Sequence, residues 1–539
     1  MLKHDATHLD SHIELIHAAP VSTGASTKVR LAELVAILSL GTDLGMAQPM
    51  EHALRQSLIA LRLAECLGLD ESERVVVYYV GLLAWVGCHV DAYEQAKWFG
   101  DDTVFKGDAR QVDMGKSLSA AGFVLGHLGA SRPLSQRART GIAFLGDGRR
   151  AVRDMVENHW LATNELAAGL ALGDEVRDSL YQTFERWDGK GAPAEAKGAQ
   201  IRVAARLVNL ADVVEVFHRA GGLEAAIAVA RERSGTQFDP ELVALFCAQA
   251  PAVFAELDDV TSWDAVIAAE PALAVVLSDE QLDASLEAIA DFVDIKSPWT
   301  IGHSRGVAAL AAAAARGHGL SDDDVVMVRR AGLVHDLGRL GVSNTIWDKR
   351  GLLTAPERER VRLHPYLTER MLASSAGLST LGAIAVQHHE RLDGSGYPRG
   401  LTGDAMTLLG KVLATADAYH AMTEPRPHRP ALPASQAATE LRAGVGRSLF
   451  EAGTVDAVLR AAGHAVKRRR ALPAGLTPRE VEVLRLLVRG LSYKEIAQEL
   501  VISRKTAGSH VEHIYAKLGV SNRARASLFA MKHGLMASE

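Results

Sequence analysis

The stretch GLVHDLGRLGV, residues 332–342, places a histidine directly before an aspartate within an otherwise apolar segment. Its apolar residues recur three and four positions apart, which is the spacing of one face of an α-helix. The same spacing runs through most of a chain that is rich in Ala and Leu and holds only 5% aromatic residues. These features predict an all-α protein, and they raise the question of whether His335 and Asp336 belong to a metal site.

A similar segment occurs in the first half of the chain. The matched stretches are GLLAWVGC (81–88) with GLVHDLGR (332–339), and ERWDGKGAP (185–193) with ERLDGSGYP (390–398). His52 stands 32 residues before Ala84, and His303 stands 32 residues before His335. Landmarks at equal separations indicate a duplicated domain.

The second copy carries metal-capable side chains that the first copy lacks. Ala84-Trp85 and Thr183-Phe184 stand where the second copy has His335-Asp336 and His388-His389. His52 and Asp212 are retained, but two isolated ligands rarely hold a metal ion. We therefore expect the first copy to be a degenerate helical domain without a complete metal site, used for dimerisation or for sensing a small molecule.

The length of 539 residues fits about three domains of roughly 100 to 200 residues each. The predicted boundaries are 30–256 for the first copy, 280–465 for the second copy, 466–474 for a linker and 475–536 for a C-terminal domain. Residues 466–539 carry 14 Lys and Arg against six Asp and Glu, a charge of +8, while the remainder carries −14. A basic module on an acidic body is typical of a nucleic-acid-binding domain attached to a separate domain.

Cys66, Cys88 and Cys247 are few and widely spaced, so neither a disulfide framework nor a thiolate metal site is indicated. The N-terminal stretch has charges and histidines where a signal peptide needs an apolar region. The most apolar stretches fall short of the roughly 20 residues that span a bilayer. We expect a cytoplasmic protein that does not enter a membrane.

Seven residues of the second copy are candidate metal ligands: His303, His335, Asp336, His364, His388, His389 and Asp417. Imidazole and carboxylate without thiolate suit Fe, Mn, Zn or Ni rather than a closed structural zinc site, and seven ligands exceed the needs of one ion. Two divalent transition-metal ions are expected, with Fe or Mn preferred and Zn or Ni also compatible. Such a pair can activate water and stabilise the charge that develops when a phosphodiester is hydrolysed. Adjacent residues on a helix point about 100° apart, so His388 and His389 can face one site only from a helix end or by reaching around the helix.

The second copy resembles the HD-GYP family of metal-dependent phosphodiesterases, over about 160 residues. The marks of the resemblance are GHSRGVA (302–308), GLVHDLGRLGV (332–342), LHP (363–365), HHERLDGSGYP (388–398) and ATADAYHAMT (414–423). The resemblance implies that Asp336 bridges two metals, which are held by His303, His335 and Asp417 on one side and by His364, His388 and His389 on the other. It also implies a cyclic dinucleotide substrate, usually cyclic di-GMP. The implied catalytic residues are Asp336 and Arg339, and the implied substrate-binding residues are Gly394, Gly396, Tyr397, Pro398, Arg426 and Arg429.

The second copy departs from the family at three places. Arg339 stands where the family commonly has Lys, which replaces a compact ammonium by a flat guanidinium. Trp299 stands where members with three metals have Glu, so two metals are expected. An FDP-like segment is kept in the first copy, as GTQFDPE (235–241), but reads SLFEAGT (448–454) in the second.

The C-terminal domain shows apolar positions at helical spacing in short bursts, each opened by a polar residue that can cap a helix. Thr477 precedes Pro478 and Glu480 in the pattern of a capping box, and Ser492 and Ser503 open the next two helices. Two short helices joined by the turn at VIS predict a helix-turn-helix.

This domain resembles the LuxR-type DNA-binding domain over about 60 residues, with LTPRE, GLSYKEIAQEL and ISRKTAGSHVEHIYAKLGVS as its marks. The resemblance implies a four-helix domain whose helix 504–518 enters the major groove of double-stranded DNA, and a homodimer. The predicted DNA-contacting residues are Lys494, Arg504, Lys505, Thr506, Ser509, His510, His513 and Lys517, and Arg523 is expected to touch the DNA backbone. Ala507-Gly508 stands where family members often have Val-Lys.

These observations predict a DNA-binding transcription regulator that hydrolyses or senses cyclic di-GMP. In a first alternative, neither copy turns over substrate, and both are scaffolds for sensing and dimerisation on a LuxR-type transcription factor. In a second, the protein is principally an enzyme that its DNA-binding domain merely localises.

Overall fold

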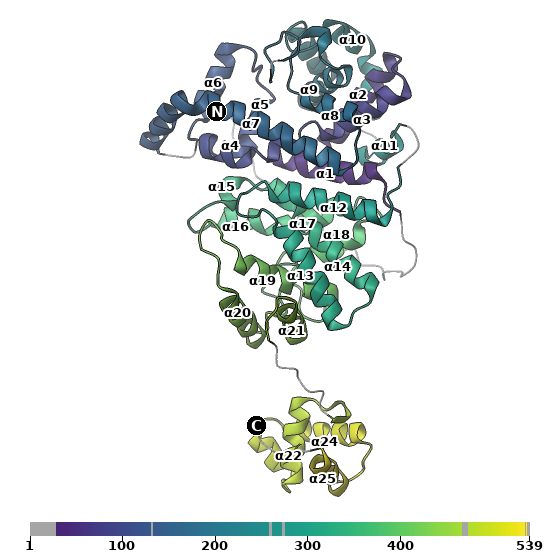
Figure 1. The fold of residues 1–539 in the computed structure, drawn as a ribbon, viewed down its shortest axis with the longest axis vertical. Coiled ribbons are helices and arrows are strands. Elements are labelled where there is room, and N and C mark those ends of the chain that lie inside the picture. Colours follow the sequence, from purple (N-terminus) through teal and green to yellow (C-terminus); the bar gives the residue numbers. More distant parts are fainter. Residues whose placement is uncertain are drawn as a thin grey trace. The chain divides into compact units, whose positions relative to one another are not determined.

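The computed structural model describes residues 28–130, 133–193, 195–257, 261–271, 275–465, 473–533 and 535. Within these ranges the chain forms helices and four isolated β-bridges, and no strand. The predicted all-α class is confirmed. The chain divides into two compact units, Met1–His464 and Ala465–Glu539 (Figure 1).

Three helices form the core of the first copy: α2, α3 and α9 pack on one another. Helix α3 begins where Asp70 accepts a hydrogen bond from the amide of Glu73 in a capping box, and α9 bends at Gly222, which has a φ of 72°. The helices of this copy are α1 (Leu31–Gly45), α2 (His52–Cys66), α3 (Glu71–Leu83), η1 (Val86–His89), α4 (Ala92–Phe99), α5 (Asp102–Ala109), α6 (Ser117–His127), α7 (Leu134–Gly169), α8 (Asp174–Tyr181), η2 (Gly198–Gln200), α9 (Val203–Glu232), α10 (Pro240–Phe254) and α11 (Ser262–Ala268).

In the second copy α13 packs against α14, α19 and α21. Helix α12 begins at the capping box of Ser278 and Gln281, and α13 ends at Gly319, which adopts the left-handed conformation that favours glycine. The helices are α12 (Asp279–Asp294), α13 (His303–His318), α14 (Asp322–Val334), η3 (Leu337–Gly341), α15 (Asn344–Trp347), α16 (Ala355–Arg362), α17 (His364–Leu372), α18 (Ser379–Ala385), α19 (Leu408–Thr423), α20 (Ala434–Gly446) and α21 (Ala452–Ala461).

The two copies share details of backbone and hydrogen bonding around their first histidine. His52 begins α2 and His303 begins α13, and each follows a residue in the left-handed conformation, with φ of 83° and 80°. A buried aspartate of the preceding helix, Asp43 or Asp294, accepts a hydrogen bond from the amide that follows the histidine. These shared features agree with the duplication that the sequence predicts.

The copies meet through equivalent surfaces. The ring of His89 on η1 lies edge-on to Phe292 on α12, with centroids 6.2 Å apart. The matching contact of the other copy joins Leu340 on η3 to Gly41 on α1, where an added Cβ would lie 2.8 Å from the leucine side chain. Phe292 and Gly41 occupy equivalent positions in the two copies, each two residues before the buried aspartate of its own helix. The packing therefore resembles that of a two-fold dimer built within one chain.

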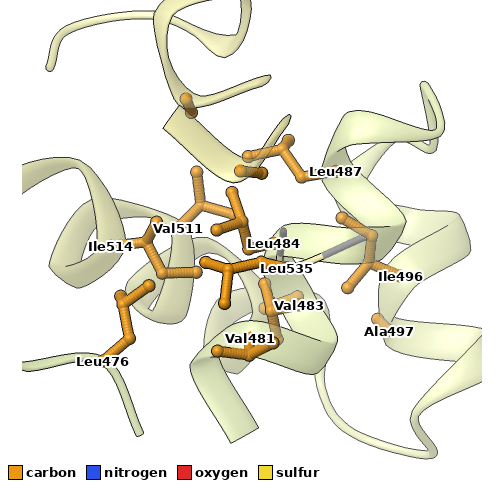
Figure 2. Close-up of a cluster of buried hydrophobic side chains, with 13 residues drawn as sticks. Leu476, Val481, Val483, Leu484, Leu487, Ile496, Ala497, Val511, Ile514 and Leu535 are labelled. Atoms are coloured by element: carbon orange, nitrogen blue, oxygen red, sulfur yellow. The ribbon is translucent and has the colours of Figure 1, made fainter. Parts of the chain in front are cut away.

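The second unit is a small helical domain with its own apolar core. Its helices are α22 (Pro478–Val488), α23 (Tyr493–Glu499), α24 (Arg504–Leu518) and α25 (Arg523–Lys532), preceded by η4 (Pro473–Gly475). Figure 2 shows the core, in which Leu484 and Leu487 of α22 meet Ile496 of α23 and Val511 and Ile514 of α24.

The predicted caps of this unit are confirmed. Thr477, Ser492 and Ser503 each accept a hydrogen bond from the amide three residues further on, and the first two form complete capping boxes. The helix-turn-helix is formed by α23 and α24, so the turn falls at the predicted place.

Two of the sequence predictions lie wholly or mainly outside the described residues: the interpretation of the N-terminus, within 1–27, and most of the linker 466–474. Across the described ranges, no single helix is long and apolar enough to cross a membrane. One bent pair, Glu71–His89 with Ala92–Phe99, reaches the required length and composition together.

Candidate metal centre and DNA-binding surface

The seven predicted metal ligands come from the ends or the interior of six elements of the second copy. His303 and His364 begin α13 and α17, His335 and Asp336 join α14 to η3, and Asp417 lies within α19. His388 and His389 follow the C-terminal end of α18, where two adjacent side chains are able to face the same site.

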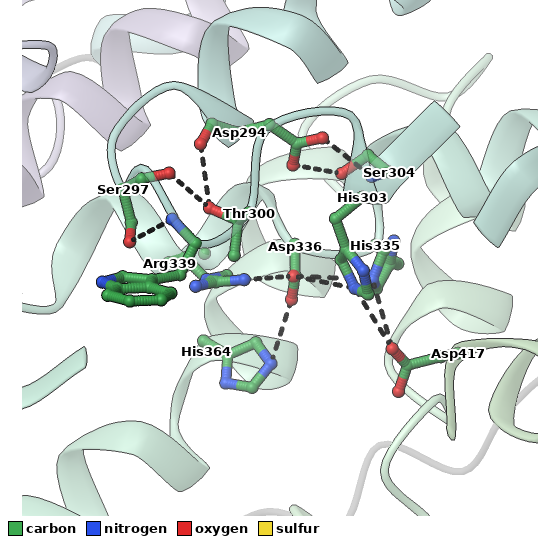
Figure 3. A network of polar contacts seen from close by, with 12 residues as sticks. Asp294, Ser297, Thr300, His303, Ser304, His335, Asp336, Arg339, His364 and Asp417 are labelled. Carbon is green, nitrogen blue, oxygen red and sulfur yellow. Dashed lines mark hydrogen bonds and ion pairs between the residues drawn. The ribbon is translucent and has the colours of Figure 1, made fainter. Parts of the chain in front are cut away.

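Asp336 lies at the centre of the cluster and presents one carboxylate oxygen to each side (Figure 3). Its Oδ2 lies 3.5 Å from His335 Nε2 and 3.9 Å from His303 Nε2. Its Oδ1 lies 3.3 Å from His364 Nε2 and 3.7 Å from His388 Nε2. The two oxygens thus face two different groups of imidazoles, which is the arrangement of a bridging ligand.

Asp417 and His389 complete the two groups. The Oδ1 atom of Asp417 lies 3.3 Å from His303 Nε2, and its Oδ2 atom lies 3.9 Å from His389 Nδ1. All seven residues occur in overlapping sets of three whose ligand atoms lie within 4.8 Å of one another.

Three of the imidazoles are oriented by backbone carbonyls. The Nδ1 atoms of His335, His364 and His388 donate hydrogen bonds to the carbonyls of the residues three positions earlier, at 2.6 to 2.7 Å. This fixes the tautomer, so each Nε2 presents a lone pair to the cluster. The Nε2 atom of His335 is buried without a hydrogen-bond partner, and those of His364 and His388 lie 3.0 Å apart. Convergent lone pairs of this kind fit a cation between them.

For three of the candidate ligands, Asp336, Asp417 and His388, the electrostatics favour the protonation state that binds metal. Burial alone would raise the pKa of Asp336, but neighbouring His335 holds it well below its usual range. Burial has the same effect on Asp417, and there the hydrogen bond with His303 lowers the pKa well below its usual range. Burial lowers the pKa of His388 to about 3, aided by the neighbouring imidazoles. Ionised carboxylates and neutral imidazoles are the forms that bind metal.

A cavity of about 270 Å³ opens above this cluster. Trp299, Trp347 and Tyr397 contribute aromatic faces to its wall, and Arg339 and Arg426 contribute guanidinium groups. Aromatic rings can stack on bases and guanidinium groups can bind phosphate oxygens, so the lining suits a nucleotide.

Only some of the predicted substrate-binding residues line the cavity. Tyr397, Arg426 and Arg429 line the cavity, whereas Gly394 and Gly396 do not. A Cβ at Gly396 would lie within 2.6 Å of backbone atoms of Glu390 and Arg391, so this glycine allows a close backbone approach behind the wall.

Pro398 likewise lies outside the lining. Arg429 donates hydrogen bonds to the carbonyls of Ala421, Met422, Glu424 and Pro430, which leaves its guanidinium largely engaged within its own loop.

Arg339, the predicted catalytic arginine, contacts the central carboxylate. Its Nη1 donates to Asp336 Oδ2 at 2.9 Å, and its guanidinium lies 4.2 Å from the ring centre of Trp347. The guanidinium is therefore held between the ring of Trp347 and the carboxylate of Asp336.

Glu424 was missed in the sequence. Its Oε2 lies 2.8 Å from His303 Nδ1, on the side of the imidazole that faces away from Asp417. Burial lowers the pKa of His303, but the hydrogen bonds with Asp417 and Glu424 raise it to about 9. The first copy offers a comparable contact, because Glu215 holds His52 Nδ1 at 2.5 Å. In both copies an acidic residue follows the last candidate aspartate within two helical turns, and this spacing is the feature of the sequence that could have indicated Glu424.

In the first copy, an arginine lies beside the two candidate ligands that this copy retains. His52 Nε2 lies 2.9 Å from Asp212, and Arg110 Nε donates to the same carboxylate at 3.1 Å. The guanidinium of Arg110 lies over the ring of Trp85, the residue that stands where the second copy has Asp336. Within the described part of this copy, no three metal-capable side chains converge.

The predicted recognition helix of the second unit, α24, is largely exposed on its polar face. Arg504, Lys505, Thr506, Ser509 and His513 are exposed, and His510 is half-buried. Lys494 and Arg523 join Arg504 around one hollow, together with Tyr493 and Tyr515. Lys517 instead donates to the capping glutamate Glu480 at 2.7 Å, which ties the last turn of α24 to α22.

Comparison with known proteins agrees with this geometry. Residues 149–242 and 287–452 match the family model of the HD domain. Over 412 residues the chain is 34% identical to the 3′3′-cGAMP-specific phosphodiesterase 3 of Vibrio cholerae. The matched residues are 76% of this chain and 89% of that protein. The chain belongs to the HD-GYP phosphodiesterase family. Residues 474–530 match the model of bacterial regulatory proteins of the luxR family. Both predicted resemblances are confirmed.

A further relative and a solved structure match different shares of the chain. The cyclic di-GMP phosphodiesterase response regulator RpfG of Xanthomonas campestris is 33% identical over 184 residues, which are 34% of this chain and 48% of that protein. The crystal structure of the V. cholerae cyclic GMP-AMP specific phosphodiesterase V-cGAP3 superposes with a TM-score of 0.56 at 27% identity, covering 81% of this chain and 99% of that chain. This chain thus joins an HD-GYP phosphodiesterase scaffold to a LuxR-type DNA-binding domain.

Proposed function

We propose that this chain is a transcription regulator whose second HD-GYP copy hydrolyses a 3′3′-linked cyclic dinucleotide, cyclic di-GMP or 3′3′-cGAMP. The observation that carries the proposal is the position of Asp336, whose two oxygens face two groups of imidazole nitrogens at the floor of an aromatic and cationic cavity. The names of the relatives support the substrate class.

In this proposal the seven residues would hold two divalent transition-metal ions, with Asp336 lying between the two groups of ligands. When bound, such ions supply a water activated for attack and neutralise charge on the phosphodiester. The orphaned Nε2 of His335 and the convergent Nε2 atoms of His364 and His388 fit this group.

Side chains of the cavity wall bind the substrate in this proposal. Arg339 and Arg426 donate N–H groups to phosphate oxygens, and Arg339 is kept in place by Trp347 and Asp336. Trp299 and Tyr397 offer faces on which the bases stack. Attack of water on one phosphodiester yields the linear dinucleotide, and a second attack yields mononucleotides.

The test is hydrolysis by the full chain, purified without oxygen and loaded with Fe²⁺ or Mn²⁺. We expect linear dinucleotide to appear from cyclic di-GMP, 3′3′-cGAMP or both, and chelation to stop its formation. If both substrates stay intact with metal bound, the protein is instead a sensing scaffold. Homodimer formation, double-stranded DNA as partner of α24 and a cytoplasmic location remain predictions that accompany this proposal.

Glu424→Gln should weaken metal binding by roughly tenfold to a hundredfold, because loss of the carboxylate charge leaves His303 less firmly oriented and less basic. A competition titration against a chelator measures the change. The matched control is Glu215→Gln, which removes the corresponding carboxylate from His52 in the first copy and should leave metal affinity unchanged. Equal affinity of Glu424→Gln and the wild type would contradict the orienting role.

Metal binding should strengthen as the pH rises toward 9. Without metal, two carboxylates raise the pKa of His303 to about 9, so binding at Nε2 must release a proton. Below that pKa the apparent affinity should increase by about tenfold per pH unit. Titrations with Mn²⁺ between about pH 6.5 and 8.5 measure the slope, and an affinity independent of pH would show that His303 binds metal without losing a proton.

A further inference from the structure

One wall of the catalytic cavity is formed by a helix of four residues. Helix α15 spans Asn344–Trp347 and is followed by Asp348, and both Trp347 and Asp348 line the cavity. A helix of one turn has almost no hydrogen bonds of its own, so its position depends on contacts with neighbouring elements.

The N-terminus of α15 is held by a carboxylate from the other copy. Oδ1 of Asp102, the first residue of α5, accepts hydrogen bonds from Ser343 Oγ at 2.6 Å and from the amide of Asn344 at 2.9 Å. Its Oδ2 accepts from Lys106 Nζ at 3.1 Å and lies 3.9 Å from Lys296 Nζ. The side chain of Asp102 is completely buried, so water does not replace these partners.

A second row of hydrogen bonds continues from this carboxylate to the cavity. Lys296 Nζ donates to Asn344 Oδ1 at 2.8 Å, and Asn344 Nδ2 donates to Asp348 Oδ2 at 2.9 Å. Ser297 Oγ donates to the other oxygen of Asp348 at 2.7 Å. Ser297 and Asp348 both line the cavity, so the network runs from the first copy to the cavity wall.

Displacement of α15 would reach the groups that surround the metal ligands. The ring of Trp347 packs under the guanidinium of Arg339 and lies edge-on to His364, with ring centres 5.3 Å apart. The orientation of Arg339 toward Asp336 therefore depends on where α15 lies.

We propose that Asp102 is a positioning residue for the catalytic cavity: the first copy, which lacks the metal ligands, supplies the anchor that holds α15 and Trp347 in place. The role of the first copy is then to complete the second copy's substrate site. The catalytic consequence rests on the proposed hydrolysis, whereas the anchoring itself does not.

Hydrogen exchange on the full chain tests the anchoring directly. In Asp102→Ala we expect the amides of residues 344–348 to exchange about tenfold faster, because loss of a helix cap shifts local opening by that order. Asp102→Asn, which keeps an oxygen that can accept from Ser343 and Asn344, should show a smaller change. The matched control is Asp108→Ala, an exposed carboxylate on the same helix whose ion pair is with His127.

Kinetics test the consequence for the substrate site. Asp102→Ala should raise KM for the cyclic dinucleotide by about tenfold with a smaller change in kcat, and bound metal should stay at the wild-type level because the ligands lie on other elements. Asp108→Ala should match the wild type in both parameters.

The outcomes separate this proposal from the proposed function. If the wild type hydrolyses neither substrate but α15 exchanges faster in Asp102→Ala, the hydrolysis fails and the anchoring stands. If α15 exchanges at the wild-type rate in both Asp102 variants, or KM is unchanged in a wild-type-active background, the positioning role is overturned. Should Asp102→Ala fail to fold, Asp102→Asn decides by the same two measurements.

Discussion

The double variant His335→Ala/Asp336→Ala should lose phosphodiesterase activity by about a thousandfold or more, together with its bound metal. Asp336 presents one oxygen to each group of imidazoles, so its loss leaves neither group with a shared carboxylate. Removal of His335 deletes the buried Nε2 that has no other hydrogen-bond partner. Metal analysis of the purified variant and initial rates with both cyclic dinucleotides measure the effect.

The same variant should bind DNA with wild-type affinity, because the second unit has an apolar core of its own. Retained DNA binding with lost hydrolysis supports an enzyme whose DNA-binding module is separable. Wild-type hydrolysis by this variant would remove the second copy from consideration as the active site. A circular dichroism spectrum of the variant checks that the loss does not come from unfolding of the first unit.

The double variant Lys494→Ala/Arg504→Ala should weaken DNA binding by roughly tenfold to a hundredfold and flatten its dependence on salt. These two cations and Arg523 line one hollow beside the exposed face of α24, where they can meet phosphates of the DNA backbone. Removal of two phosphate-binding cations per bound chain should reduce the slope of log affinity against log salt concentration by about 1.8, or about 0.9 for each cation. Binding isotherms on one promoter fragment at several salt concentrations give the slope.

A control with the same change in charge is Arg316→Ala/Arg447→Ala, two exposed arginines of the first unit. It should leave both affinity and slope unchanged. An equal loss of affinity in the two double variants would show that overall charge, rather than the hollow of the second unit, determines binding. Lys517→Ala offers a further contrast, because its pairing with Glu480 predicts lower stability of the second unit and little change in slope.

Much of the metal site was predictable because its residues are chemically distinctive. Imidazoles and carboxylates stand out in an apolar helical chain, so the seven candidate ligands could be named from the residues, whereas their division around Asp336 was implied by the resemblance to the HD-GYP family. Glu424 carried no comparable mark, since an acidic residue near a helix end is common on protein surfaces. Only its 2.8 Å approach to His303 distinguishes it from a solvated charge.

The sequence by itself determined the helical class, the duplication, the identity of the candidate ligands and the helix-turn-helix with its caps. Each of these rests on local periodicity or on a short motif, which act within one or two helical turns. Tertiary structure alone decided that Arg110 pairs with Asp212, that Lys517 pairs with Glu480, and that Asp102 reaches across to α15. Those interactions join positions far apart in the chain, and the buried packing of helices, rather than any local pattern, sets which of them meet.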